Sequence, residues 1–237
     1  MPCTLIAYWN PDAESPLIIG ANRDEDLDRP AEPYAMREGG IYCPLDVRGG
    51  TWLGMNDHGV FASLTNLEAP HVRGMSSRGN LVLDPLKTTR ASEGFIKVAK
   101  LLQDNKYNAF NLFLIDRLKF ITVSKGEGFP SIGRETTPGL HIATRWGIDT
   151  WDQPRCRYIK ETLEQDMSDE TWKKLLAYHG NGSLEEAVCV HVPEKNYATR
   201  SSCFVRAAKD WSKLHVEHTW CAPCEADHWD SYDLDLG

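Results

Sequence analysis

The residues best suited to chemistry form an unbroken polar run at the end of an apolar segment. Residues 17–21 are apolar, and Asn22, Arg23, Asp24 and Glu25 follow them directly. A buried strand that ends in ionisable residues delivers them to the rim of a core, where charges are paired and pKa values shift. Alternation along an extended chain places Asn22 and Asp24 on one face and the other two residues on the opposite face. The same run also fits a strand end followed by a solvated charged turn.

A thiol can join this polar run through a hairpin. Residues 3–9 have the pattern of a strand, turn residues occupy 10–16, and residues 17–21 return as a second strand. In an antiparallel pair with its turn there, residue 3 faces a position in the low twenties. Cys3 is therefore expected close to Arg23 and Asp24, where a nucleophile would meet an ionisable pair.

The rest of the chain alternates between groups of short strands and a few helices. Apolar spacing predicts helices over 91–103, from about 152, and from the Ser168 cap to Gly180. Residues 81–83 fit a helix or a strand equally well. Strands are expected at 41–46, 49–54, 59–66, 110–115, 119–124, 140–144, 187–192, 197–205 and 214–219, with a turn at 125–128. This order and its hairpin-type spacing predict an α+β fold with antiparallel sheets in one layered domain.

Composition narrows the class of protein. The 237 residues are 41% hydrophobic and 25% charged, with a net charge of −8 and acid concentrated in a tail from about residue 222. A nucleic-acid partner bound through a basic surface is not expected. No apolar run approaches the roughly 18 residues of a membrane span, and the N-terminus lacks a signal-peptide pattern. Seven scattered cysteines favour free thiols in a reducing cytosol, so a cytoplasmic protein is expected.

Cysteine and histidine also recur near the C-terminus at spacings that could bind zinc. The run holds His215, His218, Cys221 and Cys224 at three-residue intervals. Structural zinc sites draw on two separated pairs, and a strand would scatter these ligands. No metal is therefore predicted, although His218, Cys221 and Cys224 remain candidate ligands. The Cys-Val-His triplet at 189–191 fits either a thiol–imidazole pair or two buried strand residues.

Several blocks together resemble one family. The Asn-Arg-Asp-Glu run matches the motif for which the NRDE family, that of the transport and Golgi organisation protein 2, is named. Further matching blocks are Arg29-Pro30, Gly49 to Gly54, Leu64-Thr65-Asn66, Ser77-Arg78-Gly79, Phe110-Asn111-Leu112, Pro138 to His141 and Thr199 to Ser202. The family in turn resembles cysteine N-terminal-nucleophile hydrolases such as penicillin V acylase and bile salt hydrolase. The resemblance implies a four-layer αββα sandwich of antiparallel sheets, with residues 1–237 as a single domain.

The resemblance also implies catalytic roles. In such hydrolases an N-terminal Cys attacks an amide carbonyl, its own α-amine acts as the base, and an Asp holds that amine. Cys3 and Asp24 fall on these positions. Asn66 ends an apolar strand, where its amide could donate to an oxyanion or cap the loop; the resemblance favours the oxyanion hole. The acylase Arg has no counterpart at position 21, and Arg23 is the nearest substitute.

Substrate contacts and the final function follow from the same comparison. Asn22, Thr199 and Arg200 are expected to bind substrate, and Arg200 could bind a carboxylate. Cys3 follows Met1-Pro2, so the mechanism needs a further cleavage, or the Pro2 imino group must serve as the base. The expected function is hydrolysis of linear amide C–N bonds without a cofactor. The alternative is a non-catalytic protein that binds or traffics a small molecule, for which the family suggests haem.

Overall fold

Two antiparallel sheets form the framework of the fold. The computed structural model describes residues 3–126 and 131–237. Met1 and Pro2 lie outside the described residues, and so does part of the turn expected at 125–128. One sheet has eight strands, in the order β11-β10-β1-β2-β13-β14-β15 with β12 also paired to β13. The other has seven strands in the order β3 to β9. All pairs in both sheets are antiparallel, as the hairpin-type spacing predicts.

The strands of the eight-stranded sheet come from both ends of the chain. They are β1 (Thr4–Trp9), β2 (Leu17–Asp26), β10 (Gly139–Thr144), β11 (Gly147–Ile148), β12 (His191–Val192), β13 (Tyr197–Ala207), β14 (Lys213–Thr219) and β15 (Asp230–Asp235). The seven-stranded sheet consists of β3 (Ala31–Arg37), β4 (Ile41–Asp46), β5 (Leu53–Asn56), β6 (Phe61–Asn66), β7 (Phe110–Ile115), β8 (Phe120–Lys125) and β9 (Ile132–Glu135).

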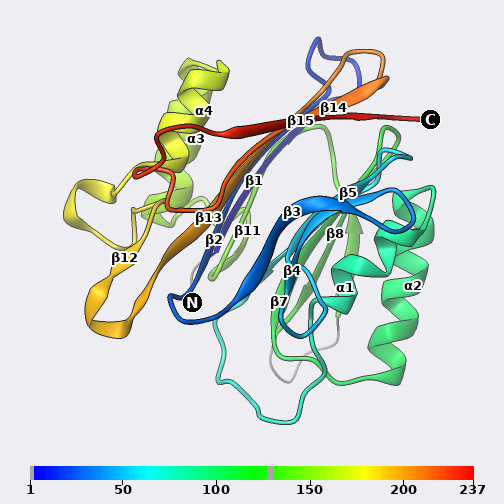
Figure 1. Ribbon diagram of the computed structural model, residues 1–237, viewed down its shortest axis with the longest axis horizontal. Helices are drawn as coiled ribbons and strands as arrows, with labels where there is room; N and C mark the ends of the chain where they lie inside the picture. Colours follow the sequence, from blue (N-terminus) through cyan, green and yellow to red (C-terminus); the bar gives the residue numbers. More distant parts are fainter. Residues whose placement is uncertain (1–2, 127–130) are drawn as a thin grey trace.

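Helices cover the outer faces of the two sheets, giving four layers (Figure 1). The helices are α1 (Asn80–Leu83), α2 (Ala91–Asp104), α3 (Pro154–Gln165) and α4 (Asp169–Leu176). Helices α1 and α2 pack on the seven-stranded sheet, and α3 and α4 pack on the eight-stranded sheet. A third core, which includes Leu5, Ile19, Phe61 and Phe113, lies between the sheets. The αββα sandwich predicted from the family resemblance is confirmed.

Strand β2 is paired on both edges, which places the polar run inside the molecule. Thr4 of β1 lies opposite Asn22, and Ser202 of β13 faces Asn22 from the other side. The hairpin register inferred from the turn residues is therefore confirmed. The register on the β13 side shifts between Thr199 and Ser201, which marks a bulge next to Asp24.

Several segments differ from the predicted elements. Strands β3, β9 and β11 were not predicted, and of the strand expected at 49–54 only Leu53 and Gly54 belong to β5. Of the strand expected at 187–192, only β12 forms, because the N–H groups of Val188 and Cys189 both donate to the Tyr178 carbonyl (2.9 and 2.8 Å) instead of a neighbouring strand. The acidic tail contains β15, which extends the sheet by pairing with β14. Residues 81–83, which fit a helix or a strand in the sequence, belong to α1.

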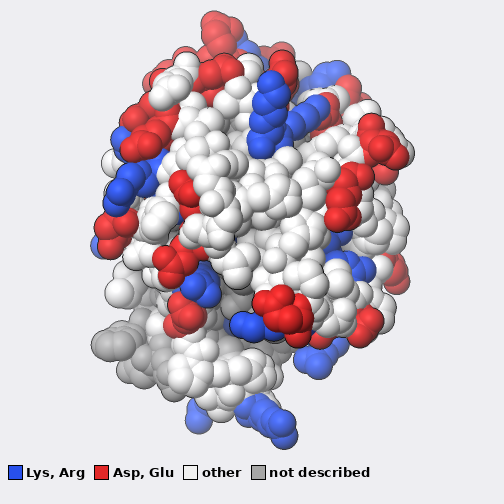
Figure 2. All heavy atoms as spheres, turned by 90° about the vertical axis from the view of Figure 1, so that its left-hand side faces the viewer, with Lys and Arg blue, Asp and Glu red and all other residues white. Residues whose placement is uncertain are grey.

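The surface view matches the mixed charge of the sequence. Figure 2 shows the side that carries α3 and α4, where Asp and Glu lie beside Lys and Arg around a broad region of other residues. Within residues 3–126 and 131–237, no helix combines the length and apolar composition that crossing a membrane requires.

Trp172 anchors α4 to the sheet, and its truncation should destabilise the protein. The Trp172 indole is fully buried. It packs against Gly20, where a Cβ atom would lie 2.9 Å from Trp172 Cε3 and would clash with the ring. Trp172→Ala should lower the free energy of unfolding by about 3–5 kcal/mol, measured by urea denaturation. Lys174→Ala, on the exposed face of the same helix, should change it by less than about 0.5 kcal/mol. Equal effects of the two variants would contradict this packing role.

Candidate active site

Asp24 is a buried carboxyl with only one of its two oxygens satisfied. Thr199 Oγ1 donates to Asp24 Oδ1 at 2.6 Å, and the Val190 N–H donates to Thr199 Oγ1 at 2.8 Å. Asp24 Oδ2 is buried with no hydrogen-bond partner among the described residues. Burial raises the pKa of Asp24 to about 7, against the opposing effects of the Thr199 bond and the Arg155 charge. A buried, half-satisfied carboxylate is suited to holding a cationic group.

Cys3 lies beside Asp24, as the hairpin register predicts. Its Sγ is 3.7 Å from the Asp24 carbonyl oxygen, and the residue is 7% exposed at the wall of a cavity. Burial, reinforced by the charge of Asp24, raises the pKa of the Cys3 thiol to about 12. The thiol is therefore neutral near pH 7, so nucleophilic attack by Cys3 requires a general base.

Arg155 supplies a buried positive charge on the side of β1 to which Thr4 points. It follows Pro154 in the first turn of α3 and is fully buried. Its Nη1 donates to Thr4 Oγ1 at 3.0 Å and its Nη2 to the Leu184 carbonyl at 2.9 Å. Its charge opposes the rise in the Asp24 pKa. Sequence reasoning missed Arg155, because nothing in the sequence distinguishes it from an ordinary helical Arg.

A cavity of about 310 Å³ opens beside Cys3, at one end of the sandwich. Its walls include the ends of β2, β4 and β6 and the loop before α1. Asn66, the last residue of β6, lines this cavity, and its side chain has no hydrogen bond to another described residue. The structure thus brings Cys3 and Asn66 to one cavity, and leaves the Asn66 amide free to donate to an oxyanion.

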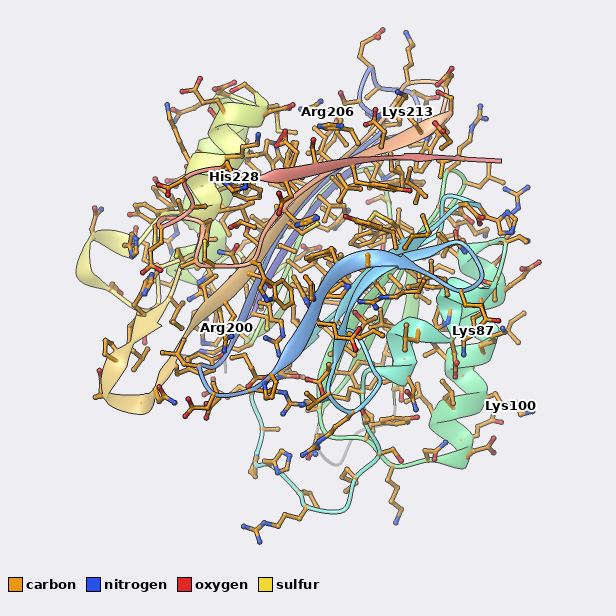
Figure 3. The ribbon with its side chains drawn as sticks, in the orientation of Figure 1. Lys87, Lys100, Arg200, Arg206, Lys213 and His228 are labelled. Atoms are coloured by element: carbon orange, nitrogen blue, oxygen red, sulfur yellow. The ribbon has the colours of Figure 1, made fainter. Side chains whose placement is uncertain are left out.

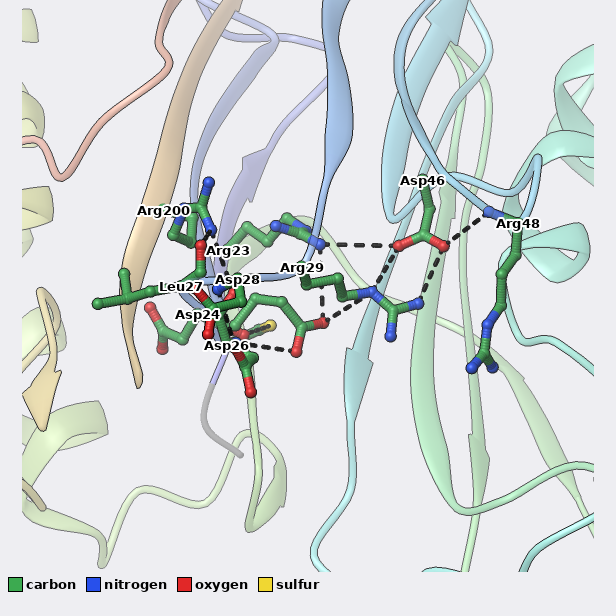
Figure 4. A network of polar contacts seen from close by, with 11 residues as sticks. Arg23, Asp24, Asp26, Leu27, Asp28, Arg29, Asp46, Arg48 and Arg200 are labelled. Carbon is green, nitrogen blue, oxygen red and sulfur yellow. Dashed lines mark hydrogen bonds and ion pairs between the residues drawn. The ribbon is translucent and has the colours of Figure 1, made fainter. Parts of the chain in front are cut away.

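Arg23 faces the cavity and belongs to a network of ion pairs (Figure 4). Its Nη2 lies 3.6 Å from Glu25 Oε2 and 3.8 Å from Asp46 Oδ2. Arg29 binds Asp46 with two hydrogen bonds, of 2.7 and 2.9 Å. Alternation is confirmed here, since Arg23 and Glu25 face this network while Asp24 faces Thr199. Arg23 lies on the cavity side with Cys3, and its charge is already shared between two carboxylates.

Arg78 is a second cavity residue with a different environment. Its Nη1 donates to the Ala109 carbonyl at 2.8 Å, and it forms no ion pair within the described parts of the chain. The following residue fixes its loop, because a Cβ at Gly79 would lie 2.7 Å from the Cα of Gly50. A close glycine–glycine contact therefore helps to place Arg78 at the cavity. The Ser77-Arg78-Gly79 block was the sequence signal for this residue.

The residues expected to bind substrate have other partners. Asn22 is fully buried and donates to the carbonyls of Leu176 (2.8 Å) and Val188 (3.0 Å). Thr199 bonds Asp24. Arg200 donates to the carbonyls of Asp26 and Leu27 and lies at the end of β13 remote from Arg206 (Figure 3). These contacts give Asn22, Thr199 and Arg200 positioning roles around the polar run.

The candidate zinc ligands near the C-terminus separate in the structure. His218 is buried, and its Nε2 lies 2.8 Å from the Tyr42 hydroxyl. Cys221 Sγ lies 3.1 Å from Thr219 Oγ1. Cys224 instead lies beside Cys189 and His191, which sequence reasoning treated as a separate pair. All seven cysteines are free, as expected.

Comparisons with known proteins identify relatives of this chain. A family model described as Transport and Golgi organisation 2 matches residues 1–221. A Transport and Golgi organization protein 2 homolog from Bos taurus is 34% identical over 244 residues, 86% of this chain and 86% of that relative. The match to the Homo sapiens homolog is 33% identical over 135 residues, covering 54% of this chain and about half (47%) of the relative.

Solved structures show the fold. Two variants of conjugated bile acid hydrolase from Clostridium perfringens superpose with TM-scores of 0.53 and 0.51, each at 10% identity, with 98% of this chain and 92% of the other chain covered. The sandwich is thus of the N-terminal-nucleophile hydrolase type.

The raised pKa of Asp24 should make stability depend on pH. The folded carboxyl keeps its proton to about pH 7, whereas the unfolded one loses it near 3.8. The bound proton makes its full contribution to the free energy of unfolding below about pH 4, and this contribution is lost as the pH rises through 7. The side chain in Asp24→Asn does not titrate. As pH rises from about 4 to above 7, the free energy of unfolding of this variant should therefore increase relative to that of the wild type by up to about 4 kcal/mol, measured by urea unfolding at several pH values.

The control for this measurement is Asp12→Asn, in an exposed turn. Its difference from the wild type should not change with pH. A difference for Asp24→Asn that is equally flat would show that Asp24 does not hold a proton in the folded state.

Proposed function

Because this chain belongs to the Transport and Golgi organisation 2 family and has an N-terminal-nucleophile hydrolase fold, we propose that it hydrolyses linear amide bonds with Cys3 as nucleophile. The observation that carries the proposal is that Cys3, Asp24 and Asn66 all line one cavity, with Asp24 Oδ2 buried and unpaired and the Asn66 amide free among the described residues. These are the parts of an acyl-transfer site, namely a nucleophile, a holder for its base and an oxyanion donor.

The base is the α-amine of Cys3 itself. Burial keeps the thiol neutral, so a base must take its proton during attack, and a free α-amine has an ordinary pKa near 8. The unpaired Asp24 oxygen is the group that would hold and orient this amine. The mechanism therefore requires cleavage of the peptide bond between Pro2 and Cys3.

The reaction proceeds in two steps. The Cys3 sulfur attacks the amide carbonyl carbon while the α-amine takes the thiol proton, and the Asn66 amide donates to the oxyanion that forms. The tetrahedral intermediate collapses when the α-ammonium returns the proton to the leaving nitrogen, which departs as an amine. Water then attacks the thioester, with the same amine as base, and releases the carboxylic acid and the Cys3 thiol.

The substrate we propose is an amide that carries a negative charge. Arg78 lines the cavity without a carboxylate partner in the described chain, whereas Arg23 and Arg29 are neutralised by Glu25 and Asp46. A desolvated guanidinium binds a carboxylate through two parallel hydrogen bonds. An N-acyl amino acid would supply both the scissile amide and the carboxylate.

An acyl-enzyme on Cys3 tests the mechanism. A variant lacking Pro2, in which Met1 removal leaves Cys3 first, should give an acyl adduct on its N-terminal peptide when mixed with N-acylglycines and analysed by mass spectrometry. Cys3→Ala in this background should lose turnover by about 10³-fold or more. Cys221→Ala, which removes a thiol outside the cavity, should retain it. Binding without turnover that survives Cys3→Ala would instead favour the alternative, a non-catalytic small-molecule carrier such as one for haem.

The role of Arg78 is tested by substrate selectivity. Arg78→Gln should lower kcat/KM for N-acylglycines by about 10- to 100-fold, the effect of losing a charge-assisted hydrogen bond. The corresponding N-acyl methylamides, which lack the carboxylate, should be hydrolysed with little change. Arg73→Gln, an exposed substitution in the same loop, is the control. Equal losses on both substrate series would contradict carboxylate binding by Arg78.

A further inference from the structure

Four potential metal ligands meet on the side of the molecule that carries β12. They are His179, which follows α4, Cys189 and His191, which flank Val190, and Cys224, which follows β14. Their donor atoms all lie within 4.8 Å of one another. Three of the ligands lie within residues 179–191 and the fourth is Cys224, so the cluster joins two separated parts of the chain, as structural zinc sites do. None of them lines the cavity beside Cys3.

The spacing of the donor atoms is that of a tetrahedral site. Cys189 Sγ lies 3.6 Å from Cys224 Sγ, and His191 Nε2 lies 3.5 Å from the first sulfur and 3.2 Å from the second. Metal bonds of about 2.3 Å to sulfur and about 2.0 Å to nitrogen separate tetrahedral ligands by about 3.8 Å (S–S) and about 3.5 Å (S–N). We propose that His179, Cys189, His191 and Cys224 bind a zinc ion.

The imidazoles are arranged as metal ligands require. His191 directs Nε2 at both sulfurs, while its Nδ1 lies 4.0 Å from Glu225 Oε1. A carboxylate bonded to the far nitrogen of a metal-bound His fixes the tautomer that leaves Nε2 free, and the exposed Glu225 side chain can reach Nδ1 by a small movement. The His179 ring stacks on the His191 ring, with centroids 5.1 Å apart, and one of its ring nitrogens lies within 4.8 Å of the other three donor atoms. Two thiolates and two imidazoles favour zinc over the harder cations magnesium and calcium.

The proposed site would hold the segment that positions the polar run. His179 and His191 flank residues 180–190, and Cys189 lies within this segment, which bonds β2 once directly and once through Thr199. Asn22 donates to the Val188 carbonyl, and the Val190 N–H donates to Thr199 Oγ1, which in turn donates to Asp24. Zinc at Cys189 and His191 would therefore fix Val190, and through Thr199 the orientation of the Asp24 carboxyl. This structural role does not depend on whether Cys3 is a nucleophile.

Metal binding can be measured directly on the full chain. Protein stripped of metal and reduced should bind zinc stoichiometrically, with release of thiol protons, and zinc should raise its Tm. Cobalt(II) in place of zinc should give the strong visible absorption of tetrahedral cobalt and a thiolate charge-transfer band.

Matched cysteine variants locate the site. Cys224→Ser, at an exposed position, should fold but lose most of the charge-transfer band and the zinc-dependent rise in Tm. Cys221→Ser, three residues away, should bind both metals as the wild type does. Absence of stoichiometric zinc or cobalt binding by the reduced protein would overturn the proposal, as would unchanged binding by Cys224→Ser. A native Cys189–Cys224 disulfide, seen as a mass lower by two hydrogen atoms, would also overturn it.

Discussion

The double pairing of β2, with β1 on one edge and β13 on the other, is the constraint on which the rest of the structure depends. Pairing with β1 sets Thr4 opposite Asn22 and so brings Cys3 to Asp24. Pairing with β13, interrupted by a bulge, brings Thr199 to the Asp24 carboxyl. Since a slip of one residue would turn every side chain of β2 to the opposite face, both pairings must hold for the polar run to be useful.

Burial then decides the chemistry of the groups that the pairing assembles. It raises the pKa of the Cys3 thiol, which is therefore neutral near pH 7, and raises the pKa of the Asp24 carboxyl to about 7, so that the carboxyl is only partly ionised there. One oxygen of the buried Asp24 carboxyl has no partner among the described residues, and the buried Arg155 guanidinium donates to Thr4. Such uncompensated buried groups cost stability and are characteristic of sites that complete their interactions with another group.

The two faces of β2 serve different purposes. On the inter-sheet side, Arg23 joins an ion-pair network at the cavity wall, and the neighbouring Arg78 keeps a positive charge without a carboxylate partner in the described residues. On the helix side, Asn22 and Asp24 are tied to the segment that leads from α4 to β13. One face is thus open to a ligand, while the other is connected to the cysteine–histidine cluster that we propose as a zinc site.

Local sequence determined most of the strands, the hairpin that brings Cys3 to Asp24 and the alternation that separates Asp24 from Arg23, because turn residues and a period of two act over short distances. Motif blocks identified the sandwich and pointed to Asn66. Tertiary structure alone decided what lies across the sheets: Arg155 at Thr4, Val190 on Thr199, and Cys224 beside Cys189 rather than with His218. The physical reason is that these contacts join segments distant in the chain, and their spacing in the sequence carries no record of which partners the packing will bring together.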